Sequence, residues 1–277
     1  MAVRFRILAS GSSGNATLIE AGGTRVLLDA GLGPRVLAGR LRAAGVEPDS
    51  LAAIVLSHEH VDHIKGAAAF AARFGLRLMG SRGTRDAGGF ASGEAARCGF
   101  DLIRPGELHT IEALSLTALA IPHDAAGPLA FVFEVGPLKL GHATDLGHLP
   151  EGVAAALAGV DALVLESNHD AGMLRSGPYP WPLKERINGP QGHLSNSDAA
   201  GFLAKRLGSR CRTVVLAHLS EVNNHPEVAR MAAEPALARA GRGDVRLEIA
   251  TREGTGWIEI AAAQRVADAD RRQFRLW

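Results

Sequence analysis

Short hydrophobic runs alternate with glycine-rich and polar turns along most of the chain. These runs have the length and the β-branched content of strands, and the turns between them hold Gly, Asp and Asn. The predicted strands cover residues 4–9, 16–20, 25–29, 53–57, 76–80, 114–121, 130–135, 138–141, 162–166, 213–217 and 246–250. The pattern therefore predicts a protein built largely on β-strands.

Segments with helical periodicity lie between the strands. The predicted helices cover residues 64–73, 153–158, 197–207 and 228–240. Residues 84–98 are rich in Gly and Ala and poorly patterned, so they are predicted as a loop or a weak helix. Residues 171–191 contain too many prolines for a core element and are predicted as a surface loop. The order indicates a mixed α/β fold made of two similar halves.

Composition limits the architecture and the partners. A chain of 277 residues with 47% hydrophobic side chains can bury a sizeable core, so one domain over residues 1–277 is expected. The formal charge of +1 means that any polyanion must be bound by a local patch. Two distant cysteines, no signal-like N-terminus and no apolar run of bilayer length predict a cytoplasmic protein without membrane contact.

Potential metal ligands are concentrated after the apolar run AAIVLS, in the stretch HEHVDH at residues 58–63. In an extended segment alternate side chains point to the same side, so His58 and His60 can bind one ion together. Where the chain turns into the next helix, Asp62 and His63 reach a neighbouring position. A second ion could lie there, about 3.5 to 4 Å from the first. The spacing therefore predicts two metal ions.

Three further potential ligands also follow apolar runs: His123 in LAIPHDA, Asp145 in GHATDLG and His218 in VVLAHLS. Each alone is more often a structural residue than a ligand. Together, at the ends of successive strands, they fit one rim where loops carry function on a rigid sheet. Imidazole and carboxylate ligands without thiolate suit Zn²⁺, Mn²⁺ or Fe, and the sequence does not choose among them.

HEHVDH resembles the HxHxDH motif of the metallo-β-lactamase superfamily, whose remaining motifs match Asp29 in LLDAG, His123, Asp145 and His218 in order. The resemblance implies a four-layered αββα sandwich. It implies one metal ion on His58, His60 and His123, a second on Asp62, His63 and His218, and Asp145 as the bridge. Asp29 would lie behind the ligands and orient them through hydrogen bonds.

The stretches ASGSSGN, ESNHD, GHLSN and AHLSEVNN look like those of the YycJ/WalJ branch of this superfamily. That branch is associated with 5′ to 3′ exonuclease activity on DNA, so the resemblance implies a nuclease-like metallohydrolase with DNA as its partner. Two ions bridged by a carboxylate can hold a metal-bound hydroxide as nucleophile and neutralise a phosphoryl oxygen. The predicted function is a binuclear metal-dependent phosphodiesterase acting on DNA.

Asp62 and His193 are the predicted catalytic residues. His193, in GHLSN, resembles in position the non-ligand histidine of related RNA-processing nucleases, and it could give a proton to the leaving oxygen. The alternative is a structural histidine at a helix entry, beside the cap-like Ser195 and Asn196.

Substrate contacts are predicted among polar residues near these motifs, namely Ser12, Ser13, Asn15, His169, Ser195, Asn196 and Asn223. The turn at residues 10–15 could offer backbone N–H groups and hydroxyls to an anion, although a plain tight turn explains it about as well. His169 with Asn168, and Asn223 with Asn224, could equally brace the metal ligands.

Positive charge is concentrated in residues 171–212, which contain seven Lys or Arg residues but only two acidic ones. Tyr179 and Trp181 lie in the same segment. The basic residues are Arg175, Lys184, Arg186, Lys205, Arg206, Arg210 and Arg212. They could bind a phosphate backbone while the aromatic rings stack on unpaired bases. A solvated charged face is the alternative. Arg271, Arg272 and Arg275 are interpreted as a tail feature.

Only 73 positions separate Asp145 from His218, too few for the large helical cap domain that many nucleases of the superfamily insert there. A strand end could reach such an open cleft. Two other functions stay open. The same metals could serve a small phosphodiester, thioester or lactone, or the protein could be a non-catalytic, metal-stabilised interaction module. An open basic groove favours the nuclease and a closed apolar pocket the small substrate.

Overall fold

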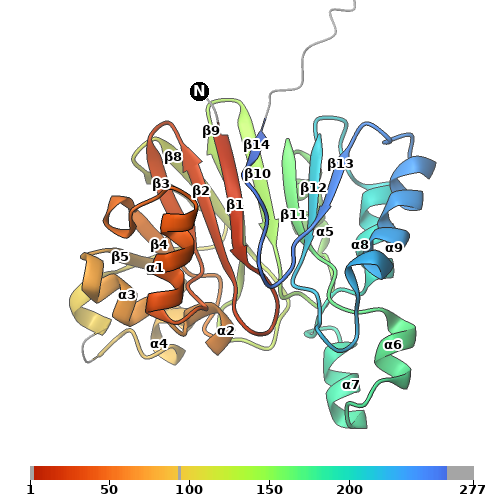
Figure 1. The fold of residues 1–277 in the computed structure, drawn as a ribbon, viewed down its shortest axis with the longest axis horizontal. Coiled ribbons are helices and arrows are strands. Elements are labelled where there is room, and N and C mark those ends of the chain that lie inside the picture. The colour runs from red at the N-terminus through yellow and green to blue at the C-terminus, as the bar shows by residue number, and fades with distance from the viewer. Residues whose placement is uncertain (1–2, 93–94, 261–277) are drawn as a thin grey trace, which may run out of the picture.

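The computed structural model describes residues 3–92 and 95–260 of the chain. The basic residues Arg271, Arg272 and Arg275 lie outside these ranges. Within them, two seven-stranded sheets lie face to face and helices cover their outer faces (Figure 1). No helix in the described ranges is both long and apolar enough to cross a lipid bilayer.

Each sheet is antiparallel in one half and parallel in the other. The first sheet runs in the order β14 (Ile258–Ile260), β1 (Val3–Ala9), β2 (Ala16–Ala21), β3 (Thr24–Leu28), β4 (Ala53–Val55), β5 (Arg77–Gly80) and β6 (Phe100–Leu102), with parallel pairing from β3 onward. The second runs β13 (Arg246–Ile249), β12 (Thr213–Ala217), β11 (Ala162–Glu166), β10 (Leu138–Ala143), β9 (Leu129–Val135), β8 (Leu114–Ala120) and β7 (Leu108–Ile111), parallel as far as β10.

The helices pack on both outer faces or extend from the edge of the sheets. Their bounds are α1 (Pro34–Ala43), α2 (Val61–Ile64), α3 (Ala67–Phe74), α4 (Arg82–Ala87), α5 (Glu151–Ala158), α6 (Ala171–Ser176), α7 (Trp181–Ile187), α8 (Asn196–Lys205) and α9 (Pro226–Arg239), with 3-10 turns at Pro48–Ser50 and Ala95–Cys98. Figure 1 shows α6 and α7 projecting beyond the two sheets.

Alternation along the strands divides the hydrophobic core into three layers. In β11, Ala162 and Val164 face the layer between the sheets, whereas Leu163 and Leu165 pack with α5, α8 and α9. Successive strand residues point to opposite faces, so this division follows from the β period of two. The outer face of the first sheet packs against α1 and α3. The predicted αββα sandwich is therefore confirmed.

Two predicted segments differ in the structure. The helix expected over residues 64–73 is split into α2 and α3 at Gly66, where a Cβ would lie 2.2 Å from the carbonyl oxygen of Leu32. The loop expected over residues 171–191 was wrong in part, because this surface segment forms α6 and α7. Pro182 lies in the first turn of α7, where proline is tolerated because that N–H would have no helical acceptor.

Candidate metal centre

The predicted site lies where strands of both sheets end. In the first sheet, Asp29 directly follows β3 and His58 comes shortly after β4. In the second, Asp145 comes shortly after β10 and His218 directly follows β12. Parallel strands end at the same edge of a sheet, so side chains placed after them converge, as at the carboxyl ends of other α/β sheets.

Three of these side chains lie on unusual backbone. Asp29, Asp145 and His218 have φ values of 62°, 62° and 55°, in the left-handed region that residues with a Cβ rarely adopt. Such conformations cost free energy and persist where the surrounding structure fixes them, often at functional sites. Here each one lies at or shortly after a strand end, and its side chain belongs to the same cluster of contacts.

The first group of ligand atoms, here called the first triad, belongs to His58, His60 and His123. One ligand atom from each lies within 4.8 Å of the others. His58 is buried, its Nδ1 lies 3.0 Å from Ser57 Oγ, and its Nε2 has no hydrogen-bond partner among the described residues. His123 donates from Nδ1 to the Gly192 carbonyl at 3.1 Å, which leaves its Nε2 toward the group.

The second group, the second triad, belongs to Asp62, His63 and His218, again with ligand atoms within 4.8 Å. Asp62 and His63 lie on the one-turn helix α2, which begins before the helix start predicted at Ile64. Asn15 Nδ2 lies 3.0 Å from His63 Nε2 and donates to Asp62 Oδ2 at 3.3 Å. His218 Nε2 is 3.5 Å from Asp62 Oδ2.

Asp145 lies between the two triads and is buried. Its Oδ2 is 3.2 Å from His63 Nε2, and its Oδ1 is 3.4 Å from His218 Nε2 and 4.0 Å from His123 Nε2. Asp29 lies behind them: its Oδ2 accepts from His63 Nδ1 at 2.8 Å, and its two oxygens accept from the backbone N–H and hydroxyl of Ser57. The seven predicted ligands are thus brought together.

Glu166 is a site residue that the sequence reasoning missed. It is fully buried, and its Oε1 accepts from His193 Nδ1 at 2.8 Å and from His218 Nδ1 at 3.0 Å. Its Oε2 accepts from the backbone N–H groups of Leu146 and Leu194. The sequence contained a signal for this residue. Glu166 directly follows the apolar run ALVL, and other site residues likewise follow apolar runs.

The buried carboxylates give the site a strongly negative field. Burial raises the pKa of Glu166, but the charges and hydrogen bonds of His193 and His218 outweigh it and lower that pKa to about 2. Burial lowers the pKa of His218, but Asp145, Asp62 and Glu166 outweigh it and raise that pKa to about 10. Burial also lowers the pKa of His193, but the charge and hydrogen bond of Glu166 outweigh burial and raise that pKa. The site therefore favours bound positive charge.

The donor set fits divalent metal ions. Histidine ligands are usually oriented by an acceptor on the other ring nitrogen. That acceptor is Asp29 for His63, Glu166 for His218 and the Gly192 carbonyl for His123, so each of these rings directs Nε2 inward. His60 is turned the other way: its Nε2 donates to the Asp124 carbonyl at 3.2 Å and its Nδ1 faces His123. Cations can replace protons on such imidazoles.

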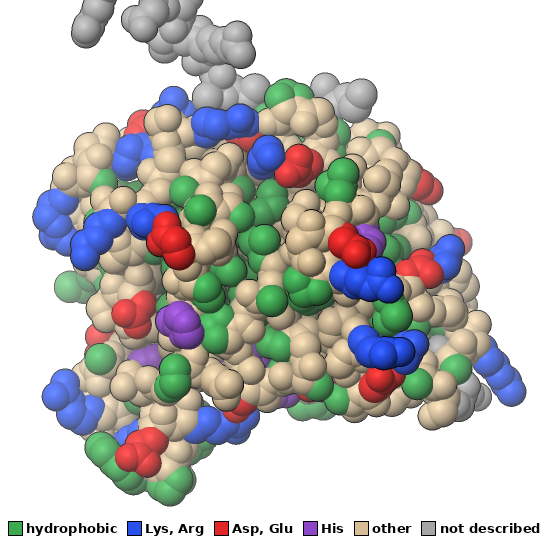
Figure 2. All heavy atoms as spheres, turned by 180° about the vertical axis from the view of Figure 1, so that it is seen from behind, with side chains coloured by type: hydrophobic (Ala, Val, Ile, Leu, Met, Phe, Trp, Pro, Cys, Tyr) green, Lys and Arg blue, Asp and Glu red, His purple; other side chains and the backbone are tan. Residues whose placement is uncertain are grey.

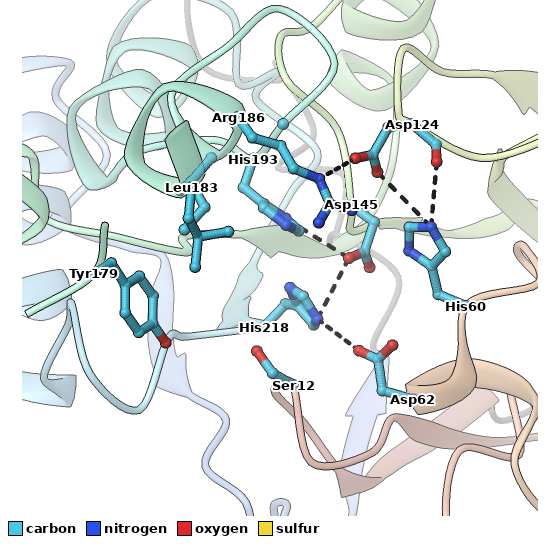
Figure 3. Close-up of a pocket in the computed structure, with 12 residues that line it drawn as sticks. Ser12, His60, Asp62, Asp124, Asp145, Tyr179, Leu183, Arg186, His193 and His218 are labelled. Carbon is cyan, nitrogen blue, oxygen red and sulfur yellow. Dashed lines mark hydrogen bonds and ion pairs between the residues drawn. The ribbon is translucent and has the colours of Figure 1, made fainter. Parts of the chain in front are cut away.

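A pocket of about 260 Å³ opens onto these groups (Figure 3). It is lined by Ser12, His60, Asp62, Asp124, Asp145, Tyr179, Leu183, Arg186, Ile187, Gly192, His193 and His218. Tyr179 and Leu183 lie across the pocket from Asp62 and His60 in Figure 3. Arg186 of α7 donates from Nε to Asp124 Oδ2 above the first triad.

The residues predicted to contact substrate lie in different places, and most of them do not line the pocket. Ser12 lines this pocket, whereas Ser13 lines a separate hollow with Leu32 and Arg40. The others are buried outside the pocket. Asn15 braces the second triad, Ser195 caps α8 through a capping box, and Asn196 bonds Asn224 and Ser167. His169 and Asn223 are fully buried and, among the described residues, their side-chain polar atoms have no hydrogen-bond partner.

The basic segment does not form one groove at the pocket. Of its seven Lys and Arg, only Arg186 is among the lining residues. Arg206 pairs with Glu151, Arg210 with Asp161 and Arg212 with Asp244. Arg175 and Lys184 line a second hollow, of about 360 Å³, on the side of α7 away from the pocket. Figure 2 shows basic and acidic side chains intermixed over the face that it presents.

Three loops of the site pack without space for a side chain at Gly31. A Cβ there would lie 1.6 Å from the carbonyl oxygen of Asp62 and 2.7 Å from the amide nitrogen of Asn15. We expect Gly31→Ala to lower the free energy of unfolding by about 3 kcal/mol, because backbone atoms must move apart. Thermal denaturation measures the loss. Gly33→Ala is the matched control, since nothing lies within 4 Å of that position. Equal stability of the two variants would contradict this packing.

Comparison with known proteins gives consistent matches. A family model described as a beta-lactamase superfamily domain matches residues 24–219. Exodeoxyribonuclease YycJ of Bacillus anthracis is 33% identical over 243 residues, 88% of this chain and 92% of the relative. Exodeoxyribonuclease WalJ of Streptococcus pneumoniae serotype 2 is 34% identical over 242 residues, 87% and 90% of the two chains.

Solved structures agree on the fold. The metallo-beta-lactamase fold protein YhfI of Bacillus subtilis has a TM-score of 0.72 at 18% identity, covering 94% of this chain and 100% of that chain. Human tRNase Z, short form, has a TM-score of 0.64 at 16% identity, covering 93% and 99%. The relatives at 33% and 34% identity confirm the resemblance to YycJ and WalJ, and together with the family model and the His and Asp groups they support a metal-dependent hydrolase. The chain belongs to the metallo-β-lactamase superfamily.

Proposed function

We propose that the protein is a binuclear metal-dependent phosphodiesterase that degrades DNA from an end, in the 5′ to 3′ direction. The observation that carries the proposal is the pair of triads joined by Asp145 at the floor of one pocket. Paired sites of this kind recur in enzymes that cleave phosphate esters. The two relatives named exodeoxyribonucleases, which match most of the chain, support DNA as the substrate.

The first triad would hold one ion, the second triad another, and Asp145 would contact both. Two divalent ions bound there, Zn²⁺, Mn²⁺ or Fe, would supply Lewis acidity for a phosphoryl oxygen and activate water for attack. Asp62 would serve as a ligand and help to position that water. Asp29, Ser57 and Asn15 hold the ligands in place through the hydrogen bonds described above.

His193 is proposed as the group that gives a proton to the leaving oxygen. It lines the pocket, and its Nδ1 is bound to Glu166 at 2.8 Å, which leaves Nε2 as the ring nitrogen available to a substrate. A positioned acid of this kind serves a poor leaving group such as the alkoxide of a sugar. Glu166 fixes the ring because the backbone N–H groups of Leu146 and Leu194 hold its other oxygen.

The pocket itself supports a flexible, charged substrate. Its lining includes the polar side chains of Ser12, Asp124, Tyr179 and Arg186, and no large inserted domain covers it within the described residues. A closed apolar pocket would favour a small ester, as expected from the general chemistry of ligand sites. The arrangement therefore supports a strand end more than a small ester.

The test is a cleavage assay on 5′-labelled and 3′-labelled DNA, in single-stranded and double-stranded form, with RNA and bis-p-nitrophenyl phosphate in parallel. We expect chelation to abolish cleavage and added Mn²⁺ or Zn²⁺ to restore it. On 5′-labelled DNA the label should appear at once in mononucleotide-sized products, because cleavage starts at that end. Turnover of the small ester without cleavage of any nucleic acid would instead assign a small-molecule substrate. Full activity after chelation would refute the metal dependence.

A further inference from the structure

The helix α7 separates two hollows of different character. Leu183, Arg186 and Ile187 face the pocket over the candidate metal centre. Trp181, Lys184 and Glu185 line the second hollow, which α7 forms with α6. This division follows the helical period, since residues three or four apart share a face. One face of α7 therefore forms a wall of the pocket over the candidate metal centre. Residues on its other face are suitable positions for control substitutions.

Among the described residues, Arg186 is the one Lys or Arg side chain that lines the pocket over the candidate metal centre. Its side chain is 61% exposed, although its Nε is bound to Asp124. Among the described residues Asp124 is its one acceptor, so the two terminal amino groups of the guanidinium remain without a protein acceptor. A planar guanidinium presents these groups as a fork that matches two oxygens of a phosphate.

Asp124 fixes this guanidinium relative to the first triad. Its Oδ1 lies 3.4 Å from His123 Nε2 and 3.8 Å from His60 Nε2, while its backbone carbonyl accepts from His60 Nε2. Its Oδ2 binds Arg186. One residue thus connects α7 to two candidate ligands of the same metal. Figure 3 shows this connection, with Arg186 and His60 on either side of Asp124.

We propose that Arg186 binds the backbone phosphate next to the scissile one, and that Asp124 positions it for this contact. The substrate class is a nucleic-acid strand with at least two consecutive phosphates. Tyr179, which also lines the pocket, offers a ring for the adjoining base, since such stacking is sequence-tolerant. This inference rests on the proposed function and adds to it the residue that distinguishes a strand from an isolated phosphodiester.

The test compares a short single-stranded oligonucleotide with bis-p-nitrophenyl phosphate, which has one phosphate only. For Arg186→Ala we expect KM for the oligonucleotide to rise roughly 10-fold to 100-fold, with kcat within about threefold, because one charge-assisted contact is lost. Both constants for the small ester should stay unchanged. Arg186→Lys should restore part of the affinity, since the charge remains but the fork is lost. Lys184→Ala, on the opposite face of α7, should change KM by less than about threefold.

A fall in kcat on both substrates would overturn the proposal, because it would show that Arg186 only supports the architecture of the site. Unchanged constants on the oligonucleotide would overturn it as well. Binding of a fluorescein-labelled, cleavage-resistant phosphorothioate oligonucleotide to the metal-loaded protein, measured by anisotropy, keeps the two proposals separate. If the wild type cleaves no nucleic acid, the proposed function fails. Weaker binding by Arg186→Ala alone would then still support the phosphate contact, and equal binding or no binding by both proteins would refute it.

Discussion

Asp145→Ala is expected to reduce metal-dependent phosphodiester cleavage at least about 1,000-fold, which corresponds to roughly 4 kcal/mol of activation free energy. Asp145 is the carboxylate whose two oxygens approach histidines of both triads, at 3.2 Å from His63 and 4.0 Å from His123. Without it the residues of each triad remain, but the carboxylate between them is lost. Metal content, measured by mass spectrometry after gel filtration, should fall together with activity.

The control for this variant is Asp49→Ala, which removes an exposed carboxylate in the 3-10 turn Pro48–Ser50. It should retain activity and metal. Circular dichroism of both variants shows whether the fold is retained. An Asp145→Ala protein that keeps both metals and more than a tenth of the activity would refute the bridging role.

His193→Ala is expected to keep its metal while cleaving DNA roughly 100-fold to 1,000-fold more slowly. Glu166 would still accept from His218 Nδ1 at 3.0 Å and from two backbone N–H groups, so the second triad keeps its orientation. The loss should depend on the leaving group. Bis-p-nitrophenyl phosphate releases a weakly basic phenolate that needs no proton, so its turnover should fall less than about tenfold.

This contrast separates three roles of His193. Equal losses on DNA and on the small ester would argue against proton donation. Loss of metal would make His193 a ligand, and its ring does belong to a group with Asp145, Glu166 and His218 whose ligand atoms lie close enough to hold an ion. Unchanged activity would assign His193 a structural role just before α8, the helix whose N-terminus Ser195 caps.

The sequence predicted those parts of the site that depend on spacing along one strand end. HEHVDH places four ligand-type side chains on a strand end and a one-turn helix, and both elements are local. Single residues after apolar runs, such as His123 and His218, were recognisable because the ends of neighbouring strands meet at one edge. The four layers were implied by the family resemblance, and the structure shows that each strand divides its side chains between two layers of the core.

Other features depend on contacts between distant segments and could not be predicted from spacing. Arg186 was one of seven basic residues in the segment 171–212, and only the fold shows that it alone of these seven lines the pocket. Asp124 carries no signal except its position after His123, yet it contacts both His60 and Arg186. The short strands β6 and β14 have three residues each, too few to show a period of two.

The projecting position of α6 and α7 has an evolutionary consequence. The candidate metal ligands lie after strand ends of the two sheets and on α2, and His193 lies just before α8. Tyr179, Leu183 and Arg186 instead belong to a surface excursion, residues 171–187, that contains α6 and α7. Substitutions in this excursion leave the buried layers untouched. Substrate choice can therefore drift among descendants while the metal chemistry is inherited unchanged, and exchanging this excursion is a direct route to redesigning what the enzyme cuts.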